Sequence, residues 1–342
     1  MNVGIIGASG YTGRELVSML SDHPHVNLSM ITSRALQGKS LSSQIPKLRG
    51  KGIDLEFQNP SPEELGKENS IDLFFLALPH GTASEYAIPL LQGGKKIVDL
   101  SADFRIRSKD TYEEYYESPY PAPEWQEKAQ YALPELHELS WEISSLLASP
   151  GCYPTSILIP LAPLLKNKLV STSEIVVNSM SGVSGAGRTP SEKLLFCERN
   201  ESSGAYGLPK HRHLSEIEEQ LSVLSDRKVI LSFHPHLIPL TRGLHSTISI
   251  PCMGKLDRQE IISCWNEFYQ GREFVHILDE NEFPETAQVV GTNRVDLSVH
   301  ADSRTNRYVL CSAEDNLIKG AGGQAIQAMN ICQGYKENSG LS

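Results

Sequence analysis

One of the six cysteines lies where a thiol becomes a nucleophile. Cys152 follows a Pro150–Gly151 turn, and Pro154 suits the first turn of a helix that the apolar stretch 156–165 continues. Unpaired N–H groups and the dipole at a helix start favour an anion, so they favour the thiolate that attacks a carbonyl carbon. The other cysteines are widely spaced without a C-x-x-C pair, and we expect them to be small buried side chains.

A thiol nucleophile needs a partner acid or base, and a pair of histidines with the spacing H-x-H could supply it. His213, with His211 as the alternative, stands just before a helical pattern. Glu216 could orient the ring of His213, and Ser215 with Glu218 fits a capping box at the start of that helix. We therefore predict His213 as the general acid or base and keep His211 as its rival.

A glycine-rich segment near the N-terminus has the form G-x-x-G-x-x-G. It follows a predicted strand and opens a predicted helix, so its backbone N–H groups can approach a pyrophosphate at the helix start. This arrangement predicts a dinucleotide site. The residues predicted to bind the cofactor there are Gly7, Ser9, Gly10, Tyr11, Thr12 and Gly13.

The end of the second predicted strand indicates which dinucleotide binds. An NAD site usually carries an acidic residue about 20 residues past the glycine loop. Here the sequence has Ser33 and Arg34, with Lys39 close behind, and no Asp or Glu at that position. These side chains suit the 2′-phosphate of NADP, since arginine offers a planar fork and lysine a point charge. We predict NADP(H) as the cofactor.

Two further segments are candidates for contact with the cofactor. Pro79 and His80 follow a strand and are predicted to border the nicotinamide ribose. Gly323, together with Gly320 and Gly322, either lets the chain approach the cofactor or only breaks a helix.

Three arginines are candidates for binding an anionic substrate. Arg105 ends a strand-loop segment with Ser101 and Asp103, at the carboxyl edge where ligands bind in such sheets. Arg188 ends a glycine-rich segment, and Arg242 lies in Thr-Arg-Gly-Leu-His. Arg105 could hold a phosphate, Arg188 a carboxylate or a phosphate, and Arg242 is a rival for the carboxylate. The alternative for each is an arginine without contact to the substrate.

Short apolar strands alternate with helical patterns in the first half of the chain, which predicts a Rossmann-like α/β fold with a doubly wound parallel sheet. The predicted strands are 2–6, 27–32, 72–78 and 96–100, and the predicted helices are 14–20 and 83–91. Tyr, Pro and Glu cluster at 112–125, which we interpret as a surface excursion.

The second half has a different pattern. Strands rich in β-branched residues follow Cys152, at 174–179, 229–233 and 247–250, and they predict a second α+β domain with a mixed sheet. The tail 321–332 is an amphipathic helix that could return to the first domain. The predicted domains are 1–149 with 316–342, and 150–315.

Composition and charge exclude several classes of protein. The 342 residues include 31 Lys and Arg against 41 Asp and Glu, and the net charge of −10 opposes binding to nucleic acid. No apolar stretch approaches the roughly 20 residues needed to cross a bilayer, and we expect no signal peptide because the N-terminus lacks a basic segment. Scattered cysteines suit a reducing compartment. We expect a cytoplasmic enzyme without a nucleic-acid or membrane partner.

Several motifs, in their order along the chain, resemble those of the N-acetyl-γ-glutamyl-phosphate reductases, a family related to the aspartate-semialdehyde dehydrogenases. The resemblance covers nearly the full length. The segments that carry it are GASGYTG (7–13), LPHG (78–81), LSADFR (100–105), ALPELHE (132–138), PGCYPT (150–155), SGVSGAGR (181–188), HRHLSEI (211–217) and NLIKGAGGQA (316–325).

The resemblance implies an NADPH-dependent reduction of N-acetyl-γ-glutamyl phosphate to N-acetylglutamate 5-semialdehyde and phosphate, in arginine biosynthesis. It implies that Cys152 is the nucleophile and His213 the acid or base. It also implies a Rossmann domain to which the last helix returns. The second domain would bind the small-molecule acyl phosphate and form a homodimer or homotetramer.

Other functions stay open at this point. A related reductase could act on carrier-bound aminoadipyl phosphate, in lysine biosynthesis, or on aspartyl phosphate. A non-catalytic NADP sensor would have no use for Cys152. A metal-dependent hydrolase would need more ligands than His234 and His236, which follow a predicted strand. We expect no metal site and a structural role for this histidine pair.

Overall fold

The computed structural model describes residues 1–255 and 257–341, which form two compact units. The first unit contains residues 1–113, 117–151 and the chain from 321 onward, and the second contains 114–116 and 152–320. The breaks therefore fall after Gly151 and Gly320, a few residues beyond the predicted boundaries. Among the described residues, no helix is both long and apolar enough to span a membrane.

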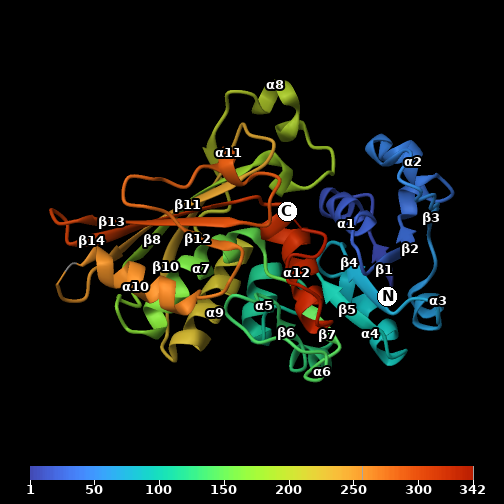
Figure 1. Cartoon of the computed structure of the whole chain (residues 1–342), viewed down its shortest axis with the longest axis horizontal. Helices are drawn as coiled ribbons and strands as arrows, with labels where there is room; N and C mark the ends of the chain where they lie inside the picture. Colours follow the sequence, from blue (N-terminus) through green and yellow to red (C-terminus); the bar gives the residue numbers. More distant parts are fainter. Residues whose placement is uncertain (256, 342) are drawn as a thin grey trace. The chain divides into compact units, whose positions relative to one another are not determined.

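The first unit is built on a parallel sheet with the strand order β3-β2-β1-β4-β5-β7-β6 (Figure 1). This confirms the predicted doubly wound α/β fold. Its strands are β1 (Asn2–Ile6), β2 (Asn27–Thr32), β3 (Phe57–Gln58), β4 (Leu73–Leu76), β5 (Lys96–Asp99), β6 (Gln130–Tyr131) and β7 (Leu146–Ala148). Its helices are α1 (Tyr11–Ser21), α2 (Leu41–Gln44), α3 (Pro62–Gly66), α4 (Ala83–Gln92), α5 (Lys109–Tyr116, of which residues 114–116 group with the second unit), α6 (Pro123–Gln126) and α12 (Gly323–Cys332).

Helices cover both faces of this sheet, which explains why its central strands are continuous apolar runs. Every residue of β4 is buried. Leu73 and Phe75 belong to the core on one face, and Phe74 and Leu76 to the core on the other. Ile326 of α12 lies in the first of these cores. The final helix thus returns to the first unit, as the resemblance implies.

The segment 112–125, predicted to be a surface excursion, is mostly exposed or half-buried, but Tyr112 and Tyr116 within it are buried. It contains the end of α5 and the start of α6, and the side chain of Tyr112 is fully buried. The Tyr112 ring meets the ring of Tyr120 edge-on at 5.6 Å, and its hydroxyl donates to Asp103 Oδ1 at 3.3 Å. Tyr112 departs from this expectation because an aromatic ring whose hydroxyl has a partner is buried favourably even in a polar stretch.

The second unit contains a mixed sheet with the order β12-β13-β14-β11-β8-β10-β9, as predicted in outline. Its strands are β8 (Ile175–Gly182), β9 (Gly204–Ala205), β10 (Leu231–Ile238), β11 (Leu244–Pro251), β12 (Val275–Ile277), β13 (Val295–Asp302) and β14 (Arg307–Glu314). Its longer helices are α7 (Cys152–Lys166), α9 (Arg212–Ser225) and α10 (Arg258–Phe268), and its short ones are α8 (Phe196–Arg199) and α11 (Thr286–Val289).

One face of this second sheet is covered by helices. The central helix α7 contacts β11 and β14 and is flanked by α9 and α10 (Figure 1). Side chains along β10 and β11 alternate between buried and partly exposed positions. The sheet thus holds α7, whose first residue is Cys152, against a packed surface.

Candidate active site

The glycine loop adopts the geometry of a phosphate-binding turn between β1 and α1. Gly7 has φ +90°, and a Cβ placed on it would lie 2.3 Å from the carbonyl oxygen of Ala77. A Cβ on Gly13 would lie 2.4 Å from the Gly7 carbonyl oxygen, so both positions require glycine for packing within the protein. A Cβ on Gly10 would come no closer than 3.9 Å to the protein. Gly10 is thus the glycine that leaves room for a ligand.

Gly10 is also the N-cap residue of α1, and no side chain caps this helix start by a hydrogen bond. The first turn of α1 carries no acidic residue. Backbone N–H groups at an uncapped helix start favour a phosphate, both by direct hydrogen bonds and through the helix dipole. The loop therefore has the steric and electrostatic properties of a dinucleotide site.

The end of β2 supports the glycine loop and places basic side chains next to it. Thr32 Oγ1 accepts the Gly7 N–H at 3.3 Å, and Ser33 Oγ donates to Ser9 Oγ at 2.9 Å. Arg34 is exposed and its guanidinium donates to Tyr86 Oη at 3.3 Å. Lys39 is exposed as well. The carboxylate that would bind a ribose 2′-OH in an NAD site is missing from the sequence here.

The residues predicted to border the nicotinamide ribose follow β4. Pro79 and His80 are exposed, and the next residue, Gly81, donates its N–H to Asp103 Oδ1 at 2.6 Å. Asp103 Oδ2 also accepts the N–H of Ser84 at 2.9 Å, so this buried carboxylate fixes the start of α4. Gly323 is buried at the start of α12.

In the second unit, Cys152 is the first residue of α7, as predicted. Cys152 is half-buried, whereas all residues from Tyr153 to Leu165 are buried. Ser156 Oγ bonds the carbonyl of Tyr153 at 3.0 Å and lies 2.8 Å from Ser246 Oγ on β11. The predicted nucleophile is therefore the first residue of a buried helix, where the helix dipole favours an anion.

Gly320 packs directly against Cys152. A Cβ on Gly320 would lie 2.7 Å from Cys152 Cβ, 3.1 Å from Cys152 Cα and 2.8 Å from Glu314 Oε1. Contacts this short do not occur between real side chains, so residue 320 has no room for a side chain. The structure thus assigns Gly320 to the surroundings of the nucleophile, a role that sequence reasoning did not consider for it.

Gly320→Ala is expected to lower kcat by roughly 10²-fold, since displacing a reacting group by about 1 Å can cost that much. The new methyl group must push Cys152, Glu314 or the turn aside. Gly204→Ala is the matched control, because a Cβ on Gly204 meets nothing within 4 Å. Steady-state turnover of both variants tests the contact between Gly320 and Cys152. A normal kcat for Gly320→Ala would show that this contact does not affect catalysis.

The structure separates the roles of the two predicted histidines. α9 begins at Arg212, and His211 is its N-cap: Nδ1 of His211 accepts the N–H of His213 at 3.2 Å. Burial, with a smaller effect from Arg212, lowers the pKa of His211 to about 4. His211 is therefore neutral at pH 7 with Nδ1 committed to the helix, which makes it a poor general acid.

The predicted capping box at Ser215 and Glu218 is wrong. Ser215 Oγ donates to the carbonyl oxygen of Arg212 at 2.7 Å, inside the helix. Glu218 Oε1 accepts the N–H of Leu231 at 3.0 Å, at the start of β10. The helix begins earlier than the motif indicated because the side chain of His211 supplies the cap instead.

Tyr153 connects the nucleophile to the histidines. It follows Cys152 directly, and its ring meets those of His211 and His213 at centroid distances of 5.5 and 5.8 Å. Its hydroxyl accepts from the hydroxyl of Tyr206 at 3.0 Å, and burial raises the pKa of Tyr153. Sequence reasoning missed this aromatic contact, although the position of Tyr153 next to the predicted nucleophile is a signal that could have found it.

Comparison with known proteins gives the same two units. Residues 2–141 match the NAD-binding domain of the semialdehyde dehydrogenases, and residues 152–316 match their dimerisation domain. The N-acetyl-gamma-glutamyl-phosphate reductase of Akkermansia muciniphila is 46% identical over 342 residues, which is 100% of this chain and 98% of that protein. The reductase of the same name from Geotalea daltonii is 45% identical with the same coverage.

The chain belongs to the N-acetyl-gamma-glutamyl-phosphate reductases, within the semialdehyde dehydrogenase family. Solved structures share its fold at low identity. Aspartate semialdehyde dehydrogenase II of Vibrio cholerae, complexed with ASA, is 14% identical, covers 96% of this chain and 97% of its own, and has a TM-score of 0.71. The Candida albicans aspartate semialdehyde dehydrogenase with NADP is 15% identical, with coverages of 97% and 98% and a TM-score of 0.69.

For this member of the reductase family, the structure places the three predicted arginines in different surroundings. Arg188 is exposed in the loop after β8. Arg242 forms an ion pair with the fully buried Asp315, with a distance of 2.9 Å between Nη2 and Oδ2. Arg105 is buried in the first unit and donates from Nη2 to the carbonyl oxygen of Leu100 at 2.7 Å. Of these three arginines, Arg188 is the exposed one.

A buried carboxylate precedes Arg105 at the end of β5. Asp99 accepts the N–H and hydroxyl of Ser101 at 3.0 and 2.7 Å. Burial and the nearby Asp103 raise the pKa of Asp99 to about 7. Perturbed carboxyl groups at the carboxyl edge of a parallel sheet are typical of functional sites, and no sequence pattern had singled out Asp99.

His234 and His236 lie inside β10 and not after it. His234 Nε2 is 2.9 Å from Ser232 Oγ and Nδ1 is 3.1 Å from Asn178 Oδ1, while His236 Nδ1 is 3.0 Å from the His234 carbonyl oxygen. Across the described parts of the chain, no group of three or more His, Cys, Asp or Glu side chains could hold a metal ion. The contacts of this pair are those of side chains that fix a strand.

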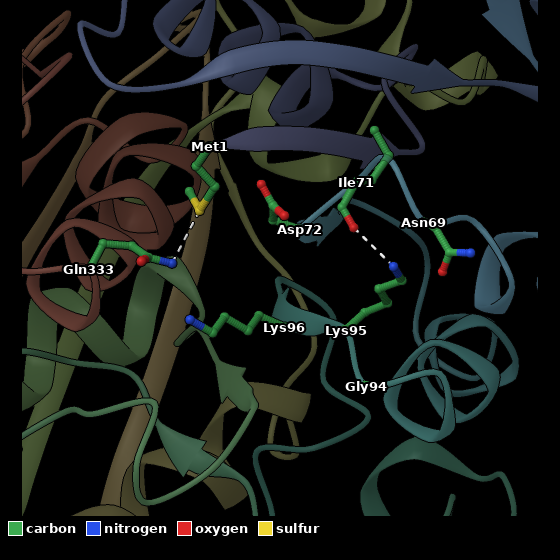
Figure 2. Close-up of a pocket in the computed structure, with 8 residues that line it drawn as sticks. All are labelled: Met1, Asn69, Ile71, Asp72, Gly94, Lys95, Lys96 and Gln333. Atoms are coloured by element: carbon green, nitrogen blue, oxygen red, sulfur yellow. Dashed lines mark hydrogen bonds between the residues drawn. The ribbon is translucent and has the colours of Figure 1, made fainter.

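A pocket of about 410 Å³ lies at the amino ends of β4 and β5, away from the carboxyl ends that carry the glycine loop and Asp103. Figure 2 shows that its polar groups bond to the protein: Lys95 Nζ to the Ile71 carbonyl oxygen at 3.1 Å, and Gln333 Nε2 to Met1 Sδ at 3.1 Å. None of the predicted site residues lines it. We therefore assign the candidate active site to the residues above and not to this pocket.

Proposed function

We propose that this chain reduces N-acetyl-γ-glutamyl phosphate to N-acetylglutamate 5-semialdehyde and phosphate with NADPH, in arginine biosynthesis. The observation that carries the proposal is Cys152 at the start of α7, one residue before a tyrosine whose ring contacts the acid/base candidate His213. Full-length identity of 46% to a reductase of that name supports the substrate. A cysteine at a helix start near an acid/base candidate, and identity to a reductase of that name, are both expected of a thiol-dependent reduction of an acyl phosphate.

The mechanism that we propose begins with attack of the Cys152 thiolate on the γ-acyl carbonyl carbon. Backbone N–H groups at the start of α7 stabilise the resulting oxyanion, and one such donor typically contributes about 3 kcal/mol. Phosphate leaves, and Cys152 holds the acyl group as a thioester. NADPH, when bound, supplies a hydride to the thioester carbon. His213 then donates a proton to the new oxyanion, and it takes the hydroxyl proton back when the C–S bond of the thiohemiacetal breaks, which releases the aldehyde and restores the Cys152 thiolate.

Arg105 and Arg188 are the proposed binding groups for the substrate's phosphate and carboxylate. Both are guanidinium groups, which recognise such oxyanions with two parallel hydrogen bonds. The exposure of Arg188 leaves it accessible to a substrate carboxylate. The position of Arg105 after β5 is where ligands bind in sheets of this type.

NADP(H), rather than NAD(H), is the proposed cofactor. The support is the exposed basic pair Arg34 and Lys39, the hydroxyl of Ser33 at the end of β2, and the absence of an acidic residue from 32 to 34. A 2′-phosphate would gain charge-assisted hydrogen bonds from these groups, whereas a 2′-OH would find no carboxylate acceptor.

Arg34→Ala is expected to raise the KM for NADPH by about 10- to 100-fold, the equivalent of one charge-assisted hydrogen bond. The KM for NADH should hardly change, because the lost group faces only the phosphate. Arg49→Ala, which removes another basic side chain of the first unit whose Nε donates to the Ser42 carbonyl oxygen, is the control. Equal effects of Arg34→Ala on both cofactors would contradict the proposed 2′-phosphate contact.

We propose a homodimer or homotetramer in the cytoplasm. The match of residues 152–316 to a dimerisation domain supports self-association. The six cysteines are free thiols, which suits a reducing compartment. Light scattering on the eluting protein measures the assembly directly, and a monomer at micromolar concentration would contradict the proposal.

The function is tested in the reverse direction with N-acetylglutamate semialdehyde, phosphate and NADP. Wild-type protein should form NADPH only when phosphate is present, and Cys152→Ala should form none. Absence of activity with intact NADP binding would reject this substrate in favour of aspartyl or aminoadipyl analogues. Activity that persists without phosphate would reject the acyl-phosphate reaction, and absence of NADP binding would reject the dinucleotide site.

A further inference from the structure

The buried Asp315 is the centre of a hydrogen-bonded cluster at the start of the turn that ends at Gly320. It follows directly after β14, and its carboxylate receives two contacts from Arg242: Nη2 to Oδ2 at 2.9 Å and Nε to Oδ1 at 3.3 Å. The N–H of Gly291 and the N–H of Leu317 also donate to this carboxylate, both at 2.8 Å. Asp315 is fully buried, whereas the side chain of Arg242 is 23% exposed.

This cluster sets the course of the chain from 315 to 320. The Asp315 carbonyl oxygen accepts the N–H of Gly320 at 2.9 Å, so one residue fixes the turn through both its side chain and its backbone. Asn316 adds a second contact to the loop that contains Arg242, because its Oδ1 accepts the N–H of Gly243 at 2.8 Å. The end of the turn is Gly320, whose Cα faces Cys152 with no room for a side chain.

We propose that Arg242 is a positioning residue for Cys152. Through its ion pair with Asp315 it holds the turn that closes on the nucleophile, and it does not bind the substrate carboxylate. The inference rests on the proposed function of Cys152 and replaces the sequence-based expectation of a substrate clamp. The physical basis is the free-energy cost of breaking the ion pair. If the Arg242 guanidinium turned toward a substrate, the buried carboxylate of Asp315 would lose its counter-charge.

The two roles predict different kinetics. A clamp binds ground state and transition state alike, so its loss raises KM and leaves kcat nearly unchanged. A positioning residue acts on the geometry of the thiol, so its loss lowers kcat. Arg242→Ala is expected to lower kcat by at least about tenfold while KM for the acyl phosphate changes little, since misplaced reacting groups cost rate. Arg242→Lys should restore part of kcat because it keeps one charged contact to Asp315.

Asp315→Asn is the second decisive variant, because its buried side chain has no access to substrate. It should reproduce the fall in kcat, and the Arg242→Ala/Asp315→Asn double variant should be no worse than the more damaged single variant. Iodoacetamide modification of Cys152, followed by mass spectrometry, gives a readout that needs no substrate. Its rate should change in both single variants, so this arm stays informative even if the proposed substrate is wrong.

A matched control exists in the same sheet. Arg294 Nε lies 2.8 Å from Oδ1 of Asp296, whose side chain is nearly buried. Arg294 Nη2 also donates to Asp296 Oδ2 and to the Gln288 carbonyl oxygen, and neither of these residues belongs to the turn from 315 to 320. Arg294→Ala should lower the melting temperature but leave kcat and Cys152 alkylation unchanged. A tenfold or larger rise in the KM of Arg242→Ala, with normal kcat and a normal Asp315→Asn enzyme, would overturn the proposal and establish a substrate clamp.

Discussion

Cys152→Ala is expected to lower turnover by about 10⁴-fold or more, because removal of the nucleophile eliminates the covalent route altogether. The substitution removes one sulfur atom from a half-buried position at the start of α7. It leaves the packed residues from Tyr153 onward unchanged, so the fold should persist. NADPH formation in the reverse assay, followed by absorbance, measures the loss.

The matched control for this variant is Cys264→Ala on α10. Cys264 is also half-buried, and its thiol accepts a hydrogen bond from Asn167 Nδ2 at 3.4 Å. This enzyme should keep normal turnover. Cys152→Ala should still bind NADPH, which cofactor fluorescence reports. Substantial turnover by Cys152→Ala would eliminate the thioester mechanism, whereas loss of cofactor binding as well would point to a folding defect.

His213→Asn is expected to lower kcat by roughly 10²–10⁴-fold, the usual contribution of a general acid or base. Asparagine has a similar size and keeps a hydrogen-bonding group, but it cannot exchange a proton near neutral pH. The edge-on ring contacts of His213 with Tyr153 and His211 would be lost as well, at a smaller cost. The measurement is the pH profile of kcat, whose imidazole-dependent limb should disappear in the variant.

His211→Asn gives the contrasting result. Asparagine is a good N-cap and can accept the His213 N–H in place of Nδ1, so α9 should still begin correctly. Because the pKa of His211 is lowered to about 4, this imidazole is unprotonated throughout the assay range and its replacement should affect kcat much less. If His211→Asn rather than His213→Asn removed the activity, the assignment of the acid/base would be reversed.

The architecture of the first unit could be predicted from sequence because its signals are local. β1 and β2 have the predicted bounds, since both are short apolar runs bounded by turn residues. The strands of the second unit were predicted too short: β11 extends over Leu244–Pro251, whereas only 247–250 was expected. Its ends pair with β14 and β8, and pairing partners far apart in the chain leave no local pattern.

The segment 112–125 lies mostly at the surface, as its composition predicted, but the burial of Tyr112 could not be predicted. Its tyrosines, prolines and glutamates have the composition of a loop, but Tyr112 is buried against Asp103 and Tyr120. The burial of a tyrosine depends on whether its hydroxyl finds a partner, which is a property of the fold and not of the segment.

The sequence by itself determined which residues can do chemistry. The role of Cys152 could be predicted because it stands between a turn and an apolar helix. The glycines could be predicted in the same way, because they stand between a strand and a helix. A helix start is formed by a few consecutive residues, so the sequence shows it directly. The tertiary structure alone decided how the candidates differ. The burial that lowers the pKa of His211, the ion pair between Arg242 and Asp315, and the contact that requires glycine at 320 all depend on desolvation or on residues distant in the chain. Desolvation and close packing arise only when the chain has folded, so no local pattern encodes them.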